Sequence, residues 1–164
     1  MGLKIIIPKE TQPGEHRVAA SVETVKKLCA LGCIVMLEKD AGLKAAIPDS
    51  AYIEAGGIIA KGHKDLYTSA DIVLKVQAPN KDEMALIPKG ALLIALLSPH
   101  SNSDLPAKFA KAGINAFAME LVPRISRAQS MDALSSQSNL SGYKAVLDAT
   151  EYYPHAFPMM MTAA

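Results

Sequence analysis

The sequence predicts an α/β protein with three αβα layers and a mostly parallel, doubly wound sheet of the flavodoxin or Rossmann-like kind. Short apolar runs that suit buried strands alternate with windows of helical periodicity. Glycine and proline residues separate these segments, as turns between elements require. The chain has 164 residues, and half of them are apolar, so it can bury the core of one domain of ordinary size.

Six strands are expected. The first run, "LKIIIP", is apolar throughout, which is typical of a parallel strand buried on both faces. Pro79 and Pro99 would end the fourth and fifth strands, because proline has no backbone donor for a sheet ladder. The expected strands lie within residues 3–8, 33–38, 58–60, 70–79, 90–99 and 114–120.

Helices are expected between these strands. Ser21 is placed to cap a helix that ends at Gly32, and Ser50 to cap one that ends at Gly56. Two short helices are expected within residues 80–88 and 103–113. A long helix is expected over residues 134–153, where Leu140, Tyr143 and Leu147 share one face.

Composition excludes several classes of function. Seventeen basic and sixteen acidic side chains leave the chain nearly neutral, so no nucleic-acid partner and no membrane-surface partner is expected. The longest apolar run, "GALLIALLSP", is too short to span a bilayer, and the start has no signal-peptide pattern, so we expect a soluble chain. Cys29 and Cys33 are expected to be reduced thiols that pack in the core.

Neither a metal site nor a hydrolase triad is expected. The four histidines are far apart in the sequence, none has a second histidine four residues on, and no Ser-x-Gly elbow lies nearby. No G-x-G-x-x-G follows any strand and no Walker lysine is present, so the usual backbone cradle for a pyrophosphate is missing from this chain.

Doubly wound folds bind ligands beyond the carboxyl ends of their strands, so the loops at that edge are of interest. The loop after the first strand contains Glu10, Glu15, His16 and Arg17, and its plainest interpretation is a solvated, salt-bridged loop. Lys75 interrupts an apolar strand. Either it reaches out of the strand end to water, or it holds an anion in the crevice together with Arg17.

The segment "MELVPRISRAQSMDALSS", residues 119–136, is the most unusual stretch. It is too long for a tight turn and rich in arginine forks, hydroxyls and amide and carboxylate groups. Such groups at the mouth of the crevice could hold a flat, amide-bearing ring at several edges. Alternatively, Arg124, Arg127 and Asp132 satisfy one another on the surface, and the residues alone leave both interpretations open.

Three motifs resemble a known family. "PKETQPGEHRVAASVETVKKL", "ADIVLKVQAP" and above all "ELVPRISRAQSMDALSSQSNLSGYKAV" resemble the start of the α subunit of proton-translocating NAD(P) transhydrogenase, in the alanine dehydrogenase/transhydrogenase N-terminal domain family. The resemblance covers essentially the whole chain. It implies a soluble domain that binds NAD(H), a membrane domain, and a third domain that binds NADP(H), with hydride transfer coupled to proton translocation.

The resemblance also implies roles for the loop residues, which would lie over the nicotinamide of NAD(H). Arg124, Asp132 and Ser135 would orient the ring and its carboxamide, and Gln129 would reach toward the NADP(H)-bearing partner. Their work is geometric, because direct hydride transfer needs two rings held in contact and away from water. The catalytic residues implied are Arg124, Gln129, Asp132 and Ser135, and the cofactor-binding set adds Ile125, Ser126 and Arg127.

Alanine dehydrogenase is the alternative within the same resemblance. Arg17 and Lys75 match residues that grip pyruvate there, but Leu97 stands where a catalytic histidine is expected, and the loop has no counterpart. An architectural role for Arg17 and Lys75 is therefore the leading interpretation.

The resemblance implies a longer domain, whose glycine-rich nucleotide-binding half would follow "HAFPMMMTAA". We expect an α/β subdomain over residues 1–133 and a connecting helix and tail over residues 134–164. The chain would be a fragment or the product of a split gene, inactive alone, with a homodimer expected. It would lie on the cytoplasmic side, held at the inner membrane by partner subunits.

A third alternative is a non-catalytic assembly module. The apolar tail supports the assembly-module alternative in part, because its aromatic and methionine side chains are too apolar to remain in water. They would pack against the missing half or fold back on the core. The residues are Tyr152, Tyr153, Phe157 and Met159 to Met161.

Overall fold

The computed structural model describes residues 2–155. The chain forms two compact units, Met1–Leu121 and Val122–Ala164. The tail residues Phe157 and Met159 to Met161 lie outside the described residues, so the expectation about their packing is not addressed.

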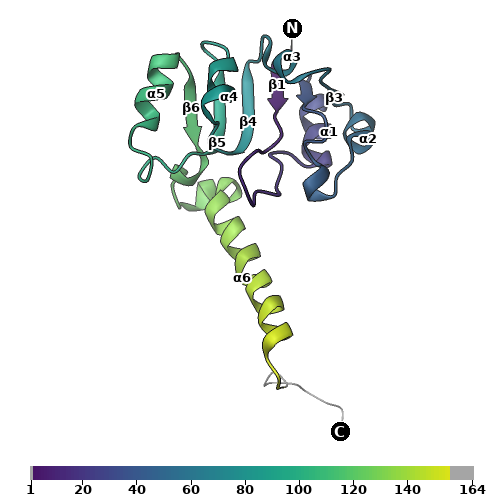
Figure 1. The fold of residues 1–164 in the computed structure, drawn as a ribbon, viewed down its shortest axis with the longest axis vertical. Coiled ribbons are helices and arrows are strands. Elements are labelled where there is room, and N and C mark those ends of the chain that lie inside the picture. The colour runs from purple at the N-terminus through teal and green to yellow at the C-terminus, as the bar shows by residue number, and fades with distance from the viewer. Residues whose placement is uncertain (1, 156–164) are drawn as a thin grey trace. The chain divides into compact units, whose positions relative to one another are not determined.

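A six-stranded sheet forms the centre of the first unit (Figure 1). Its strands lie in the order β3-β2-β1-β4-β5-β6, and every neighbouring pair is parallel. The predicted α/β, doubly wound class is confirmed. The strands are β1 Lys4–Ile7, β2 Ile34–Leu37, β3 Ile58–Ile59, β4 Ile72–Gln77, β5 Leu92–Leu96 and β6 Asn115–Ala118.

Two apolar cores cover the two faces of this sheet. Ile6 and Ile7 belong to different cores, because successive side chains of a strand point to opposite faces. Ile7 packs with α1 (Val22–Ala30) and α2 (Asp49–Glu54), which supply Val25 and Tyr52. Ile6 packs in the core that includes residues of α3 (His63–Tyr67), α4 (Lys81–Leu86) and α5 (Leu105–Ala112).

Most predicted helix signals are confirmed. Ser21 Oγ accepts the backbone N–H of Thr24 at 3.2 Å, and Gly32, with φ of 84°, follows the end of α1 in the left-handed region that glycine adopts without strain. The prediction for Ser50 was wrong. Pro48 holds the N-cap position of α2, so Ser50 lies within the first turn. Helix α3 was not expected, since its five residues are too few to show a period.

The thiols pack as predicted. Cys29 and Cys33 are half-buried and lie against the core of α1 and α2. Both are free thiols, and Cys29 Sγ contacts the carbonyl oxygen of Gly56 at 3.4 Å.

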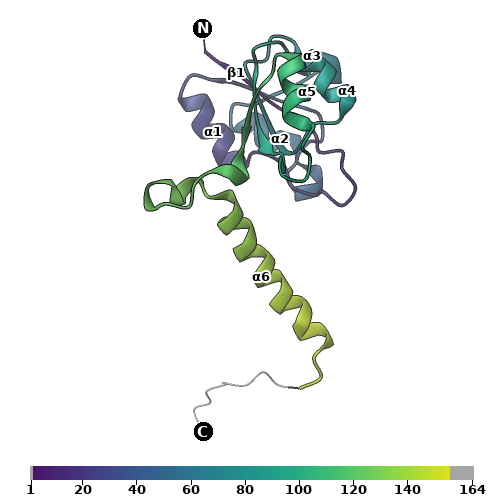
Figure 2. The ribbon, with the colours of Figure 1, turned by 90° about the vertical axis from the view of Figure 1, so that its left-hand side faces the viewer.

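The second unit consists of a 3₁₀ turn, η3 (Ser126–Met131), and the long helix α6 (Ala133–Tyr152). Figure 2 shows α6 as one unbroken helix. Its start and end agree with the prediction within one residue. The helix has no buried residue, and Leu140, Tyr143 and Leu147 remain 59%, 67% and 47% exposed. Over residues 2–155, no helix combines the length and apolarity needed to cross a bilayer.

Candidate functional site

A buried side chain connects two neighbouring strands at the point where the strand order of the sheet reverses. Strands β1 and β4 are neighbours although they are far apart in sequence, and such a switch point is where doubly wound folds open a crevice. Glu10, from the loop after β1, is buried there, and its Oε1 accepts the backbone N–H of Val76 at 2.6 Å. A carboxylate thus bridges the two strands from within.

Lys75 is completely enclosed at this edge. Its side chain is 1% exposed, and its Nζ lies 2.8 Å from Glu83 Oε1 and 3.5 Å from Glu10 Oε2. Neither of the two expected outcomes holds, because the ammonium group neither reaches water nor faces an open anion site. A buried ammonium needs partners of opposite charge, and two glutamates provide them.

The start of α4 holds one of these glutamates in place. Asn80 Oδ1 accepts the backbone N–H groups of Asp82 and Glu83, both at 2.9 Å, and Glu83 Oε2 accepts the backbone N–H of Asn80 at 2.8 Å. This reciprocal capping box fixes the Glu83 carboxylate, whose second oxygen meets Lys75. The N-x-x-E spacing in "PNKDEM" is the sequence signal for this arrangement, which the strand and helix patterns alone do not reveal.

Arg17 is also engaged at this edge. Its Nε and Nη2 donate to the two carboxylate oxygens of Glu15 at 2.8 and 2.7 Å, and Gln77 Nε2 donates to the same carboxylate at 2.7 Å. The hydrogen bond from Arg17 lowers the pKa of Glu15 to about 2. The guanidinium fork is therefore occupied by a fixed carboxylate, which supports the architectural role over an anion-binding one.

The end of β5 carries no acid–base group at the position considered for alanine dehydrogenase. Leu97 is 4% exposed and belongs to the core of α3, α4 and α5. Its backbone N–H donates to Glu120 Oε1 at 2.8 Å, and the backbone N–H of Ser98 donates to the same atom. Within residues 2–155, no three His, Cys, Asp or Glu side chains come together as a metal site would require.

The polar loop predicted as a site lies in the second unit. Residues Ser126 to Met131 form η3, and Ala128 is its buried residue. The other predicted loop side chains point outward, and Ile125 is 55% exposed. In the portion of the chain that the structure describes, no hydrogen bond or ion pair engages the side chains of Arg124, Arg127 or Gln129. The exposed members are Arg124, Ile125, Ser126, Arg127, Gln129 and Ser135.

Asp132 and Ser135 are the predicted residues that the structure brings into contact. Asp132 caps α6: its Oδ1 accepts the backbone N–H of Ser135 at 2.9 Å, and its Oδ2 accepts the Ser135 hydroxyl at 2.6 Å. The hydroxyl, then the backbone N–H, and to a lesser degree the nearby charge of Arg124 lower the pKa of Asp132. Neither arginine forms an ion pair with Asp132 in the described chain, so mutual satisfaction on the surface does not account for the loop.

This arrangement offers donors and acceptors in fixed directions rather than a proton relay. Arginine donates only, glutamine donates and accepts, and an ionised carboxylate accepts only. Asp132 has a pKa lowered below the usual aspartate range and is ionised at neutral pH, and each of its oxygens keeps a further lone pair after bonding Ser135. The loop can therefore orient a polar planar group, and residues 124–135 include no histidine or cysteine to act as an acid or base.

The fold and the candidate site together define the class of protein. It is a doubly wound α/β domain that is followed in the chain by a polar loop and a long helix. Residues 6–141 match the family model described as the alanine dehydrogenase/PNT N-terminal domain, and the chain belongs to this family.

Two comparisons connect the chain with transhydrogenases. It is 52% identical, over 167 aligned residues, to the first part of NAD(P) transhydrogenase subunit alpha of Rhodospirillum rubrum, covering 99% of this chain and 44% of the relative. Its fold matches the crystal structure of transhydrogenase from Sinorhizobium meliloti with a TM-score of 0.89 and 49% identity, covering 98% of this chain and 48% of that one. The chain thus spans somewhat less than half the length of these proteins.

Similarity to alanine dehydrogenase is weaker. An L-alanine dehydrogenase structure matches with a TM-score of 0.71 and 31% identity, covering 76% of this chain and 34% of that one. The comparisons therefore support the N-terminal part of a transhydrogenase alpha subunit, within an oxidoreductase family that uses nicotinamide nucleotides.

Proposed function

We propose that this chain supplies the nicotinamide-covering part of the NAD(H)-binding component of a proton-translocating NAD(P) transhydrogenase. The observation that carries the proposal is the segment from Arg124 to Ser135, in which exposed arginine and glutamine side chains precede a carboxylate that caps the start of α6. The proposal includes hydride transfer from NADH to NADP⁺ coupled to proton translocation, with the chain inactive alone.

Each loop residue has a distinct role in this proposal. Asp132 accepts the carboxamide N–H of the nicotinamide, since its carboxylate is ionised and its direction is fixed by Ser135. Arg124 donates to the carboxamide oxygen, and Gln129 spans toward the second nucleotide. The segment Ile125 to Arg127 covers the ring and excludes water. The nicotinamide itself supplies the hydride, so the side chains contribute contact geometry and no proton.

Further parts of the enzyme belong to the same proposal. A nucleotide-binding half would hold the pyrophosphate and adenosine, because this chain has no glycine-rich loop for them. An NADP(H)-binding domain and a membrane domain would complete the enzyme. We also propose a homodimer, located on the cytoplasmic side of the membrane.

Oxidation of alanine is a poorer match to the structure. The guanidinium of Arg17 is held by Glu15, the ammonium of Lys75 is shared by Glu10 and Glu83, and Leu97 is a core residue. A carboxylate substrate would have to displace buried partners to reach these cations, which is energetically unfavourable.

The assembled enzyme tests the proposal through Gln129→Ala. The variant is expected to slow NADH-to-NADP⁺ hydride transfer by about tenfold or more while the NADH dissociation constant changes less than about twofold. The reason is that Gln129 acts between the nucleotides. Stopped-flow absorbance measures the transfer, and NADH fluorescence measures the binding.

Ser130→Ala is the matched control, because Ser130 lies in the same 3₁₀ turn and has no role in the proposal. It should retain the hydride-transfer rate. Equal losses of rate and of NADH affinity in Gln129→Ala would contradict the assigned role, and an unchanged rate would remove Gln129 from the site.

A further inference from the structure

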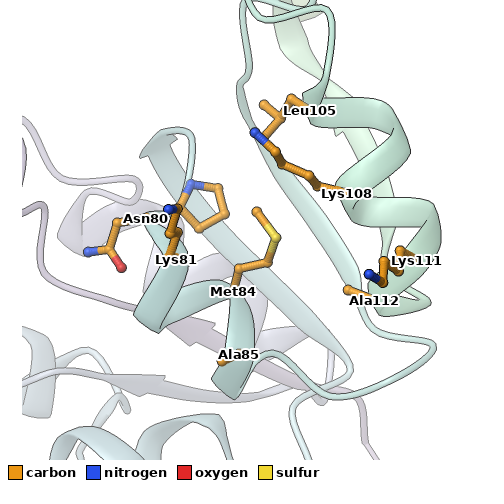
Figure 3. A pocket seen from close by; sticks show the side chains of 9 residues that line it. Asn80, Lys81, Met84, Ala85, Leu105, Lys108, Lys111 and Ala112 are labelled. Atoms are coloured by element: carbon orange, nitrogen blue, oxygen red, sulfur yellow. The ribbon is translucent and has the colours of Figure 1, made fainter.

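An open groove of about 650 Å³ lies between α4 and α5 on the first unit (Figure 3). Its floor is apolar: Met84 projects from α4 between the two helices, and Leu105 and Ala112 face it from α5. These three side chains are only half-buried. A thioether on such a floor adapts to different apolar partners, because methionine is flexible and polarisable.

Three lysines border this α4–α5 groove. Lys81 stands on the α4 side, and Lys108 and Lys111 stand on the α5 side. All three are exposed, and none of them forms an ion pair with any residue among 2–155. The groove lining includes no aspartate or glutamate. The groove is thus an apolar strip between positive charges that have no internal counter-ion in the described chain.

The α4 wall of the groove is firmly anchored. The Asn80 capping box fixes the first turn of α4, and Glu83 on the inner side of that helix pairs with the buried Lys75. This pairing turns the Glu83 carboxylate away from the groove and leaves Lys81 on the outside. A wall held in this way loses little entropy when a partner binds.

We propose that the α4–α5 groove docks an acidic amphipathic helix of a partner protein. Two helices with an apolar floor between them form the kind of site that receives a third helix through its apolar face. Carboxylates flanking that face would meet Lys81, Lys108 and Lys111, which gives charge complementarity. The groove is open to solvent, so it would leave much of a small molecule in water, whereas a helix would bury its apolar stripe there.

This inference does not depend on the proposed function. Every residue that lines the groove belongs to the first unit, and the candidate nicotinamide loop belongs to the second. A mutation that abolishes helix binding in the groove therefore leaves the role of the nicotinamide loop measurable, and the reverse also holds.

A fluorescein-labelled helical peptide of about 14 residues is the probe, with leucine at positions i, i+3, i+4 and i+7 and glutamate at most other positions. Fluorescence anisotropy against this chain should show saturable binding that weakens between about 50 and 300 mM salt. The double variant Lys108→Glu/Lys111→Glu should weaken binding at least about tenfold.

The control Lys26→Glu/Lys61→Glu changes the net charge equally at exposed sites outside the groove and should bind as the unmodified chain does. Met84→Ser tests the floor and should also weaken binding. If the control variant weakened peptide binding as much as Lys108→Glu/Lys111→Glu does, the binding would depend on the net charge of the chain alone, and the proposal would be overturned. Absence of binding would overturn it as well, as would binding only to phosphatidylglycerol vesicles, which would assign the groove to a lipid surface.

Discussion

Lys75 joins two parts of the sheet's carboxyl-end edge in the interior of the molecule. A single ammonium group lies between the carboxyl groups of Glu10 and Glu83, and all three side chains are at most 3% exposed. Glu10 also ties the loop after β1 to β4 through the N–H of Val76. One cation therefore connects the switch point of the sheet with the start of α4.

Lys75→Met is expected to lower the free energy of unfolding by about 3–5 kcal/mol, because it leaves two carboxyl groups together in the interior without a counter-charge. Urea denaturation followed by circular dichroism measures the change. The triple variant that adds Glu10→Gln and Glu83→Gln should recover a substantial part of the loss. A Lys75→Met chain with the unfolding midpoint of the unmodified protein would show that the cluster contributes nothing.

At the scale of elements, the loop between β1 and α1 is held to β4 by a hydrogen bond from the Gln77 amide to Glu15, whose carboxylate also forms an ion pair with Arg17 inside the loop. Glu15 lies between Arg17 and Gln77, and its lowered pKa means that the folded state favours the ionised carboxylate. Stabilisation from this carboxylate is fully present above about pH 4.5 and is lost as the pH falls toward about 2.

The melting temperature of Arg17→Met should therefore lie below that of the unmodified chain at pH 7, by at most about 4 °C because Arg17 is partly exposed. The gap should narrow as the pH falls from about 4.5 to 2. Lys26→Met, an exposed lysine without an ion pair among residues 2–155, is the control and should show no gap. A gap that stays constant down to about pH 2.5 would contradict the role of the Glu15 carboxylate.

The elements with a local sequence signal were predictable, and those with an ambiguous signal or none were not. Long apolar runs and the Ser21 and Gly32 signals predicted strands and α1, because burial and capping are local requirements. Ser50 was misassigned because Pro48 can hold the same position with its extended backbone. Helix α3 has too few residues to show a period.

The site was predictable only in part. The polarity of residues 124–135 and the resemblance of that segment to the family indicated the loop. They did not show that Asp132 caps α6, because the hydrogen bonds that Asp132 accepts from Ser135 depend on local geometry. The partners of Lys75 come from two segments distant in sequence, so no local pattern could pair Glu10 with Glu83.

At the scale of the whole molecule, the described chain divides the proposed work between its two units. The first unit provides an α/β scaffold with an exposed groove, and the second presents the loop and α6. The apolar stripe of α6 is exposed, and the matched relatives are more than twice as long as the region they share with this chain. The proposed function therefore includes another half of the domain, which binds the nucleotide and is not part of this chain.

The most direct test of the central claim is an NADH fluorescence titration of two proteins: this chain alone, and this chain fused to the nucleotide-binding half of a relative. We expect no saturation below about 1 mM for the chain alone, saturable binding by the fusion, and weaker binding by the fusion with Arg124→Ala. Micromolar binding by the chain alone, or binding by the fusion that Arg124→Ala leaves unchanged, would contradict the claim that the loop covers the nicotinamide of a site completed elsewhere.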